Sequence, residues 1–342
     1  MFRLSPSSFL FATALTAATV SAEAIGYFDS ESCVDPIGLG QCYAEADEWL
    51  SDCVTNRCKG QNIDCINVCH CVTTQNQIDC AGAHCWNQVY SCEYQQTVGD
   101  LGNYCLNPEL EKIPFYPPPD NAPGSCSCSL GKLLVSLSTT SAELETCGAN
   151  GTEIAGQLGS SEDSENFPLA CICCAQSGML SAFSQICPDT DPSLLGIDDA
   201  YQALVAGDEN WPMCAEYMKA FPCASMLGYT PPGGDDSAVF YEPGNFPPNG
   251  TATLSNIAGS ITSPVSGAVY TWTHDGREDI VTVASADAHP TNAAGTNDED
   301  KGGDGDGNAG NNNENKKNMA PSDRPRVLPT ICGLVLLLIT IL

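Results

Sequence analysis

One stretch of the chain gathers thiol and imidazole side chains at short spacing. Cys69, His70 and Cys71 are consecutive, Cys80 follows, and a second His-Cys pair comes at 84–85. Thiolate and imidazole groups this close together are the ligands that zinc requires. In an oxidising compartment, however, thiols are normally consumed by disulfide pairing. Whether this stretch predicts a metal site or disulfides therefore depends on whether the chain enters an oxidising compartment.

The amino-terminal segment has the three parts of a secretory signal peptide. Arg3 gives a short basic region, residues 9–20 are apolar, and Ala22-Glu23-Ala24 is a small-x-small cleavage motif. The apolar run is too short to span a bilayer, which takes roughly 20 apolar residues. Cleavage after Ala22 and cleavage after Ala24 fit equally well. We predict a signal peptide over residues 1–24, and a mature chain that begins outside the cytosol.

The carboxyl-terminal segment has the order of a glycosylphosphatidylinositol (GPI) attachment signal. Residues 327–342 are almost entirely apolar, a polar spacer precedes them at 321–326, and small residues lie further upstream. We predict that residues 319–342 form a propeptide that is removed. The lipid is then expected on Asn318, or on Asn313.

The cysteine count supports both terminal predictions. The chain has 21 cysteines, and Cys332 lies in the predicted propeptide, so the mature head keeps an even number. We therefore predict structural disulfides, no metal site and no cofactor. The predicted disulfide cysteines are Cys33, Cys42, Cys53, Cys58, Cys65, Cys69, Cys71, Cys80, Cys85, Cys92, Cys105, Cys126, Cys128, Cys147, Cys171, Cys173, Cys174, Cys187, Cys214 and Cys223.

A proline-rich connector divides this cysteine-rich head. The connector covers residues 114–125 and separates eleven cysteines, in subdomain 1 (25–113), from nine, in subdomain 2 (126–228). Because both numbers are odd, full pairing requires at least one disulfide between the subdomains. Spacing alone does not give the connectivity.

The apolar spacing predicts a mainly α-helical, small, disulfide-rich head. Helical periodicity is found at 43–58, 85–94 and 211–221, and in two apolar stripes that start at Leu130 and Met179. Asp191-Pro192-Ser193 has the form of a helix start before residues 194–205.

After residue 228 the composition changes to that of a stalk. Residues 229–318 are rich in Ser, Thr, Gly and Asn, which predicts a disordered, O-glycosylated segment. Within it, two alternating runs around His274-Asp275-Gly276 predict a short β-hairpin over 268–284. An isolated hairpin is marginally stable in water, so this one needs a partner surface. Two Asn-x-Thr motifs, at Asn150 and Asn249, predict N-glycosylation in glycine-containing loops.

The formal charge of −30, from 42 acidic and 12 basic residues, excludes two classes of partner. Nucleic acids and anionic lipid headgroups both attract basic surfaces. We therefore expect no nucleic-acid partner, and a membrane contact made only through the GPI lipid. Cell-wall polysaccharide and other surface proteins remain as candidate partners.

Eight of the cysteines from residue 53 onward form one series, Cys53, Cys58, Cys65, Cys69, Cys71, Cys80, Cys85 and Cys105. Their order resembles that of the fungal CFEM domain, a helical domain with eight cysteines. Some members of that family bind haem through an aspartate, so the resemblance implies an alternative function as a haem- or iron-binding receptor. Two features depart from the pattern. Cys92 is additional, and Ile66-Asn67-Val68 precede Cys69 without the aspartate, while Asp64 lies at a different position.

No catalytic motif is found in the sequence. A Gly-x-Ser-x-Gly elbow, a phosphate-binding glycine loop and a His-Glu-x-x-His pair are all missing, so we expect no enzyme. His274 and His289 fall in the predicted stalk, where no rigid site would hold them. The enzymatic alternative is a wall-polysaccharide-modifying enzyme. A hydrolase of this kind needs two carboxylates about 5 to 9.5 Å apart across one cleft.

The whole layout resembles the cysteine-rich GPI-anchored surface proteins of filamentous ascomycete fungi. The resemblance rests on the leader, the Cys-His-Cys and His-Cys-Trp runs of the head, the Ser/Thr-rich stalk and the terminal signal. It implies a location on the extracellular face of the plasma membrane, with transfer to the cell wall as a further expectation. The function that we expect is structural, adhesive or ligand-capturing.

Overall fold

A computed structural model describes residues 28, 30–59, 62–105, 108–157, 161–197, 201, 211–234, 238–274 and 276–285. Between residues 150 and 165 it describes the backbone alone. The predicted signal peptide, both candidate lipid sites (Asn313 and Asn318), the propeptide with Cys332, and residues 286–318 of the predicted stalk lie outside the described residues.

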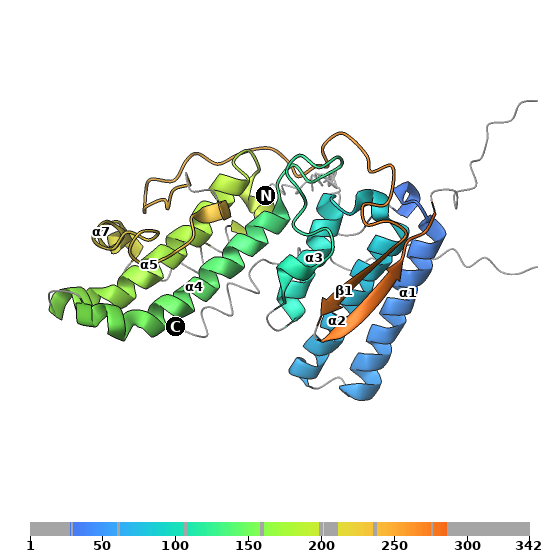
Figure 1. The fold of residues 1–342 in the computed structure, drawn as a ribbon, viewed down its shortest axis with the longest axis horizontal. Coiled ribbons are helices and arrows are strands. Elements are labelled where there is room, and N and C mark those ends of the chain that lie inside the picture. The colour runs from blue at the N-terminus through green and yellow to red at the C-terminus, as the bar shows by residue number, and fades with distance from the viewer. Residues whose placement is uncertain are drawn as a thin grey trace, which may run out of the picture.

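The described chain is mainly helical, as predicted, and ends in a two-stranded hairpin (Figure 1). The α-helices are α1 (Pro36–Asp52), α2 (Ile63–His84), α3 (Cys92–Tyr104), α4 (Leu130–Gln157), α5 (Ser161–Ile186) and α7 (Cys214–Ala220). A π-helical turn, η2 (Cys53–Arg57), continues α1. The short 3₁₀ turns are η1 (Ser30–Ser32), η3 (Trp86–Gln88), η4 (Leu110–Lys112), η5 (Pro192–Leu195), η7 (Trp211–Met213) and η8 (Pro232–Gly234). The strands are β1 (Val269–His274) and β2 (Arg277–Thr282), which pair antiparallel.

Subdomain 1 packs α1, α2 and α3 together at one end of an elongated head (Figure 1). The Asp35 carboxylate starts α1 by accepting a hydrogen bond from the Gly38 amide at 2.9 Å. Pro36 takes the first helical position, where its missing N–H is not needed. Asn62 caps α2 in the same way as Asp35 caps α1, because its side chain accepts from two amides of the first turn. The core of this half includes Leu39, Ile78, Trp86, Val98 and Leu101.

Subdomain 2 is built on the long pair α4 and α5, which lie side by side at the other end of the head (Figure 1). Leu133 and Leu137 of α4 share one core with Met179 and Phe183 of α5. The stretch Asn166–Ile186 is apolar enough to cross a membrane, but 78% of that window is buried inside the head. Within the described residues, α5 is therefore the core helix of the second half.

All twenty predicted cysteines form disulfides in the structure. The pairs are Cys33–Cys85, Cys42–Cys80, Cys53–Cys69, Cys58–Cys65, Cys71–Cys105, Cys92–Cys126, Cys128–Cys187, Cys147–Cys171, Cys173–Cys214 and Cys174–Cys223. Cys92–Cys126 is the one disulfide among them that joins the two subdomains, as the two odd counts require. Disulfides at this density are typical of extracellular proteins.

The proline-rich connector is fixed against both halves of the head. The Tyr94 hydroxyl of α3 donates to the Pro114 carbonyl at 2.6 Å, and the ring of Tyr116 is buried. On the other side, Pro117 touches α4 so closely that a Cβ added to Gly131 would lie 2.9 Å from the proline Cβ. Two subdomains with a disulfide and a packed connector between them form one unit.

The expected start of a disordered stalk at residue 229 is wrong, because the described residues from 229 to 285 pack on the head. Tyr229 is buried and its hydroxyl donates to the Cys171 carbonyl at 2.7 Å. Further along, the Ser127 amide donates to the Ser255 carbonyl at 2.8 Å. The Ala284 amide then donates to the Ala83 carbonyl of α2, also at 2.8 Å. A polar composition did not prevent this segment, which we call the strap, from following the surface in an ordered path.

The predicted hairpin is present, and α2 is the partner surface that it needs. Trp272 and Val281 point inward and are buried, while Val269 and Ile280 point outward. Tyr270 lies over Gly82 of α2, where an added Cβ would collide with the tyrosine hydroxyl. The glycine therefore makes room for the hairpin.

The helix predictions meet mixed outcomes. The helices expected at 43–58, at the two apolar stripes and at 211–221 are found, the last as η7 followed by α7. The helix expected at 85–94 is wrong, because α2 ends at His84 and η3 and a turn precede α3. Asp191 starts η5 as predicted, but most of residues 194–205 lie outside the described part of the chain.

Candidate functional sites

The Cys-His-Cys stretch lies on α2, and its side chains do not converge on one point. Cys69 pairs with η2 and Cys71 with the end of α3, each in a disulfide. The His70 ring stacks on Tyr104 with 4.7 Å between centroids, and burial lowers the pKa of His70. His84, at the far end of α2, instead contacts Asp35, with 2.9 Å between Nδ1 and the carboxylate.

Three cysteine sulfurs do come together, but none is a thiolate. The sulfurs of Cys53, Cys58 and Cys69 lie within 4.8 Å of one another, and those of Cys58 and Cys69 are 3.3 Å apart. Cys53–Cys69 and Cys58–Cys65 are disulfides that pack against each other. Sulfur in a disulfide offers no thiolate ligand to a metal.

The eight cysteines that resemble the CFEM order do not form a closed set. Three disulfides lie within the eight, but Cys80 pairs with Cys42, and Cys85 pairs with Cys33. The additional Cys92 makes the link between subdomains. Asp64 is exposed in the first turn of α2, and it lines none of the three recesses described below.

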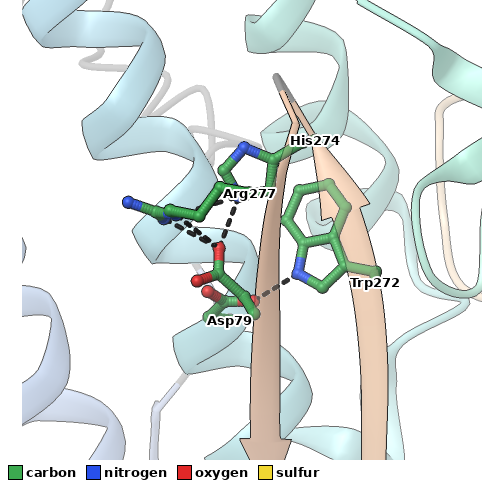
Figure 2. A network of polar contacts seen from close by, with 5 residues as sticks. Asp79, Trp272, His274 and Arg277 are labelled. Carbon is green, nitrogen blue, oxygen red and sulfur yellow. Dashed lines mark hydrogen bonds and ion pairs between the residues drawn. The ribbon is translucent and has the colours of Figure 1, made fainter.

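A partly buried polar network joins the hairpin to α2 (Figure 2). The indole Nε1 of Trp272 donates to the carboxylate of Asp79 at 2.7 Å. Beside it, Asp279 receives the Arg277 guanidinium at 2.7 Å and lies 2.5 Å from His274 Nε2. The cross-strand register explains this cluster, since Trp272 is opposite Asp279 and His274 is opposite Arg277.

The two carboxyl groups of the network titrate in opposite directions. Burial raises the pKa of Asp79 to about 6, and the nearby Asp279 charge adds to this, against the hydrogen bond from Trp272. Partial burial also disfavours the ionised form of Asp279. Hydrogen bonds and charge from Arg277 and His274 outweigh that effect and hold the pKa of Asp279 below its ordinary value.

Aromatic side chains surround the network on its inner side. Burial raises the pKa of Tyr94 and of Tyr270, and the charge of Asp79 raises both further. The Phe115 ring meets the Tyr270 ring edge-on at 5.3 Å. The hydroxyls of Tyr116 and Tyr270 are buried without a hydrogen-bond partner among the described residues. The polar groups of the network thus bond to one another, and they attach the hairpin to α2.

The expectation that His274 has no rigid surroundings is wrong. The imidazole packs against the Trp272 ring at a tilt of 39°, with 4.4 Å between centroids, and contacts Asp279 and Arg277. The alternating pattern of 268–284 was the available signal for this, but it did not indicate which surface the hairpin covers. His289 lies outside the described residues.

A recess of about 370 Å³ lies where the connector meets subdomain 2 and the strap. Its walls come from the connector, the start of α4, the end of α5, η8 and the strap near Ile257. The lining residues are Pro118, Pro119, Asp120, Asn121, Ser125, Cys126, Ser127, Ser129, Lys132, Gln185, Ile186, Pro232, Gly233, Ala238 and Ile257. We call it the junction cleft. No sequence pattern indicated it, because its walls come from separate parts of the chain.

Two smaller recesses lie elsewhere on the described head. One, of about 260 Å³, contains Glu109 and Glu111, and the other, of about 220 Å³, contains Asn249. The two glutamates lie two residues apart at η4, and Glu109 pairs with Lys112 at 2.6 Å. Residues so placed on one turn do not face each other across a cleft, as the two carboxylates of a glycoside hydrolase do.

The two predicted N-glycosylation sites differ in their surroundings. Asn249 is exposed in a loop, as expected. The loop predicted for Asn150 is wrong, because Asn150 and the two residues after it lie within α4.

Comparison with protein-family models, with curated proteins and with solved structures finds no match for this chain. The residues of the head and their contacts are therefore the basis for inferring a function.

Proposed function

We propose that the chain is an extracellular, GPI-anchored glycoprotein whose disulfide-stapled head captures a ligand at the plasma membrane or cell wall. One observation carries this proposal. Every cysteine from Cys33 to Cys223 is paired, which leaves Cys332, in the terminal apolar run, as the remaining cysteine of the sequence. Complete pairing fits export through an oxidising pathway. Loss of the terminal run on lipid attachment would leave no odd thiol.

The two ends of the sequence support the same location. Residues 1–24 have the organisation of a signal peptide, and residues 319–342 have that of a GPI propeptide, with Asn318 or Asn313 as the lipid site. The charge of −30 disfavours direct binding to anionic lipid, so the attached lipid would supply the membrane contact.

The form of the head favours capture of a ligand over catalysis. The three recesses described above do not place two carboxylates across a cleft, whereas the junction cleft offers a rigid recess with polar lining. Wall polysaccharide or another surface protein is the class of partner that fits a head displayed outside the cell.

Digestion of intact expressing cells with phosphatidylinositol-specific phospholipase C tests the anchor. We expect the protein to pass from the membrane pellet to the supernatant, with a lipid-remnant peptide ending at Asn318 or Asn313 in the mass spectrum. A matched variant that stops after Arg326 lacks the apolar run and should be secreted without any digestion. If the protein stays with the membranes while other GPI proteins of the same cells are released, the proposal fails.

A further inference from the structure

The junction cleft is preformed, because disulfides and a backbone hydrogen bond hold its walls in place. Cys126 in the wall is linked to α3, and Cys128, two residues on, is linked to the end of α5. The Ile257 amide donates to the Ser125 carbonyl at 2.8 Å, which fixes the strap against the connector. A rigid recess loses little conformational entropy when it binds a ligand. Its volume of about 370 Å³ is within the range of small-molecule sites, roughly 300 to 1,000 Å³.

The lining of the cleft is neutral in a strongly acidic molecule. Lys132 and Asp120 are its charged side chains, and they form an ion pair with each other. An anionic ligand would meet no spare positive charge there and would be repelled by the rest of the head, which belongs to a chain of formal charge −30. A cationic ligand would find the Asp120 carboxylate already paired with Lys132. The charge balance therefore selects an uncharged ligand.

Three serine hydroxyls and two side-chain amides make up the uncharged polar part of the lining. Ser125 is only 6% exposed, and its hydroxyl has no hydrogen bond to any described residue. The Ser127 hydroxyl accepts from the Ser255 amide at 3.2 Å and keeps its own proton to donate. Gln185 uses its amide N–H on the Val239 carbonyl and keeps its oxygen as an acceptor. Groups that both donate and accept suit a ligand that carries many hydroxyls.

The apolar part of the lining is mainly aliphatic. Pro118, Pro119 and Pro232 contribute to it, together with Ile186. Ligand sites combine apolar walls with a few polar groups that fix orientation. A ligand with C–H faces and a rim of hydroxyls matches both parts of this lining.

We propose that the junction cleft binds a short, neutral saccharide segment. This inference rests on the proposed function, since it names the class of ligand that the surface head would capture. The serine hydroxyls and the Gln185 oxygen bond the sugar hydroxyls, and the proline rings pack against the C–H faces of the sugar.

Binding is tested with the full chain, purified in detergent with its disulfides intact. The probes are linear neutral oligosaccharides of glucose, mannose, galactose and N-acetylglucosamine, with polygalacturonate as the charged control. We expect one neutral series to bind. The double variant S125A/S127A should weaken that binding about tenfold, which corresponds to about 1.4 kcal/mol and is within what two hydrogen bonds contribute. The matched control is S138A, which removes a hydroxyl of α4 that lines the recess near Lys112.

The outcomes separate this inference from the proposed function. Unchanged binding in S125A/S127A, equal weakening in S138A, binding of the charged polymer alone, or no binding of any probe would each overturn the saccharide site. Near-native circular dichroism and an intact disulfide mass must accompany the double variant. A variant that misfolds is replaced by A238W, which fills the cleft and should abolish binding. Release by phospholipase without saccharide binding refutes the site alone, and saccharide binding without release refutes the anchor alone.

Discussion

Replacing Asp79 by asparagine removes a half-buried negative charge from the contact between the hairpin and α2. Asparagine has nearly the same shape, and its side-chain oxygen still accepts the hydrogen bond from the Trp272 indole. The groups that face Asp79 are His274, Arg277 and Asp279 from the hairpin, Tyr270 from β1, and Tyr94 from α3. All of these remain in the variant.

The magnitude follows from the pKa of Asp79, which burial raises from 3.8 to about 6. A raised pKa means that the closed head prefers the protonated carboxyl. The stability that the protonated Asp79 carboxyl contributes is complete below about pH 4 and is lost as the pH rises through 6. At about 1.4 kcal/mol per tenfold change, the ionised carboxylate costs the closed hairpin at most about 3 kcal/mol at pH 8. The asparagine variant avoids this cost, so its hairpin should open up to about 100-fold less often at pH 8.

Hydrogen exchange read by mass spectrometry measures this opening. The reporter is the Ala284 amide, which bonds to the Ala83 carbonyl of α2. The ratio of exchange rates between wild type and D79N at one pH cancels the intrinsic pH dependence. We expect a ratio near one at pH 4 that rises through pH 6 and is largest at pH 8. The matched control is D100N, because burial also raises the pKa of Asp100 to about 6, but on α3.

Two results would refute this reasoning. Equal exchange of wild type and D79N at pH 8 would show that the Asp79 charge does not destabilise the closed hairpin. An equal effect of D100N on the hairpin amides would show a general change of stability instead of a local one.

Three further predictions concern packing, cross-linking and modification. G82A should speed hydrogen exchange of the hairpin amides, because a methyl group there collides with the tyrosine hydroxyl of β1. The control is G99A on α3, where an added methyl group meets nothing within 4 Å. It should raise the free energy of unfolding by about 0.5 to 1 kcal/mol. C92S/C126S removes the link between subdomains and should lower the free energy of unfolding by about 3 to 4 kcal/mol in urea, and no loss would contradict a closed loop of 34 residues. N249Q should remove one glycan from the intact mass of the secreted protein, since this asparagine is exposed, and an unchanged mass would show that the site is unused.

The cysteines made much of the head predictable. Their number and division predicted full pairing and a link between the halves, because an odd set cannot close on itself. Their partners were not predictable, since Cys80 and Cys85 pair upstream of the pattern that they resemble. Pairing depends on which helices pack, and spacing along the chain does not carry that information.

The remaining misses have a common physical reason. Helix α2 was not predicted because its buried face includes Thr73, Thr74 and Gln75, which interrupt the apolar period. The strap looked unable to fold because its own composition buries little. Its order comes from surfaces made elsewhere, such as Gly82 for Tyr270. The junction cleft was hidden for the same reason.

The position of the disulfides also sets how the head responds to a mechanical load. Cys223 is the last cysteine of the described residues, and the strap that follows is held by hydrogen bonds and packing alone. A pull applied beyond residue 285 therefore meets non-covalent contacts first, and these yield before any covalent loop is loaded. At about 3.4 Å per residue, the roughly 60 residues of the detached strap would have a fully extended length of about 200 Å. The stapled body behind them cannot lengthen in the same way. The strap would therefore extend under load while the disulfide-linked part of the head keeps its length. Shear at a surface would be taken up by the strap.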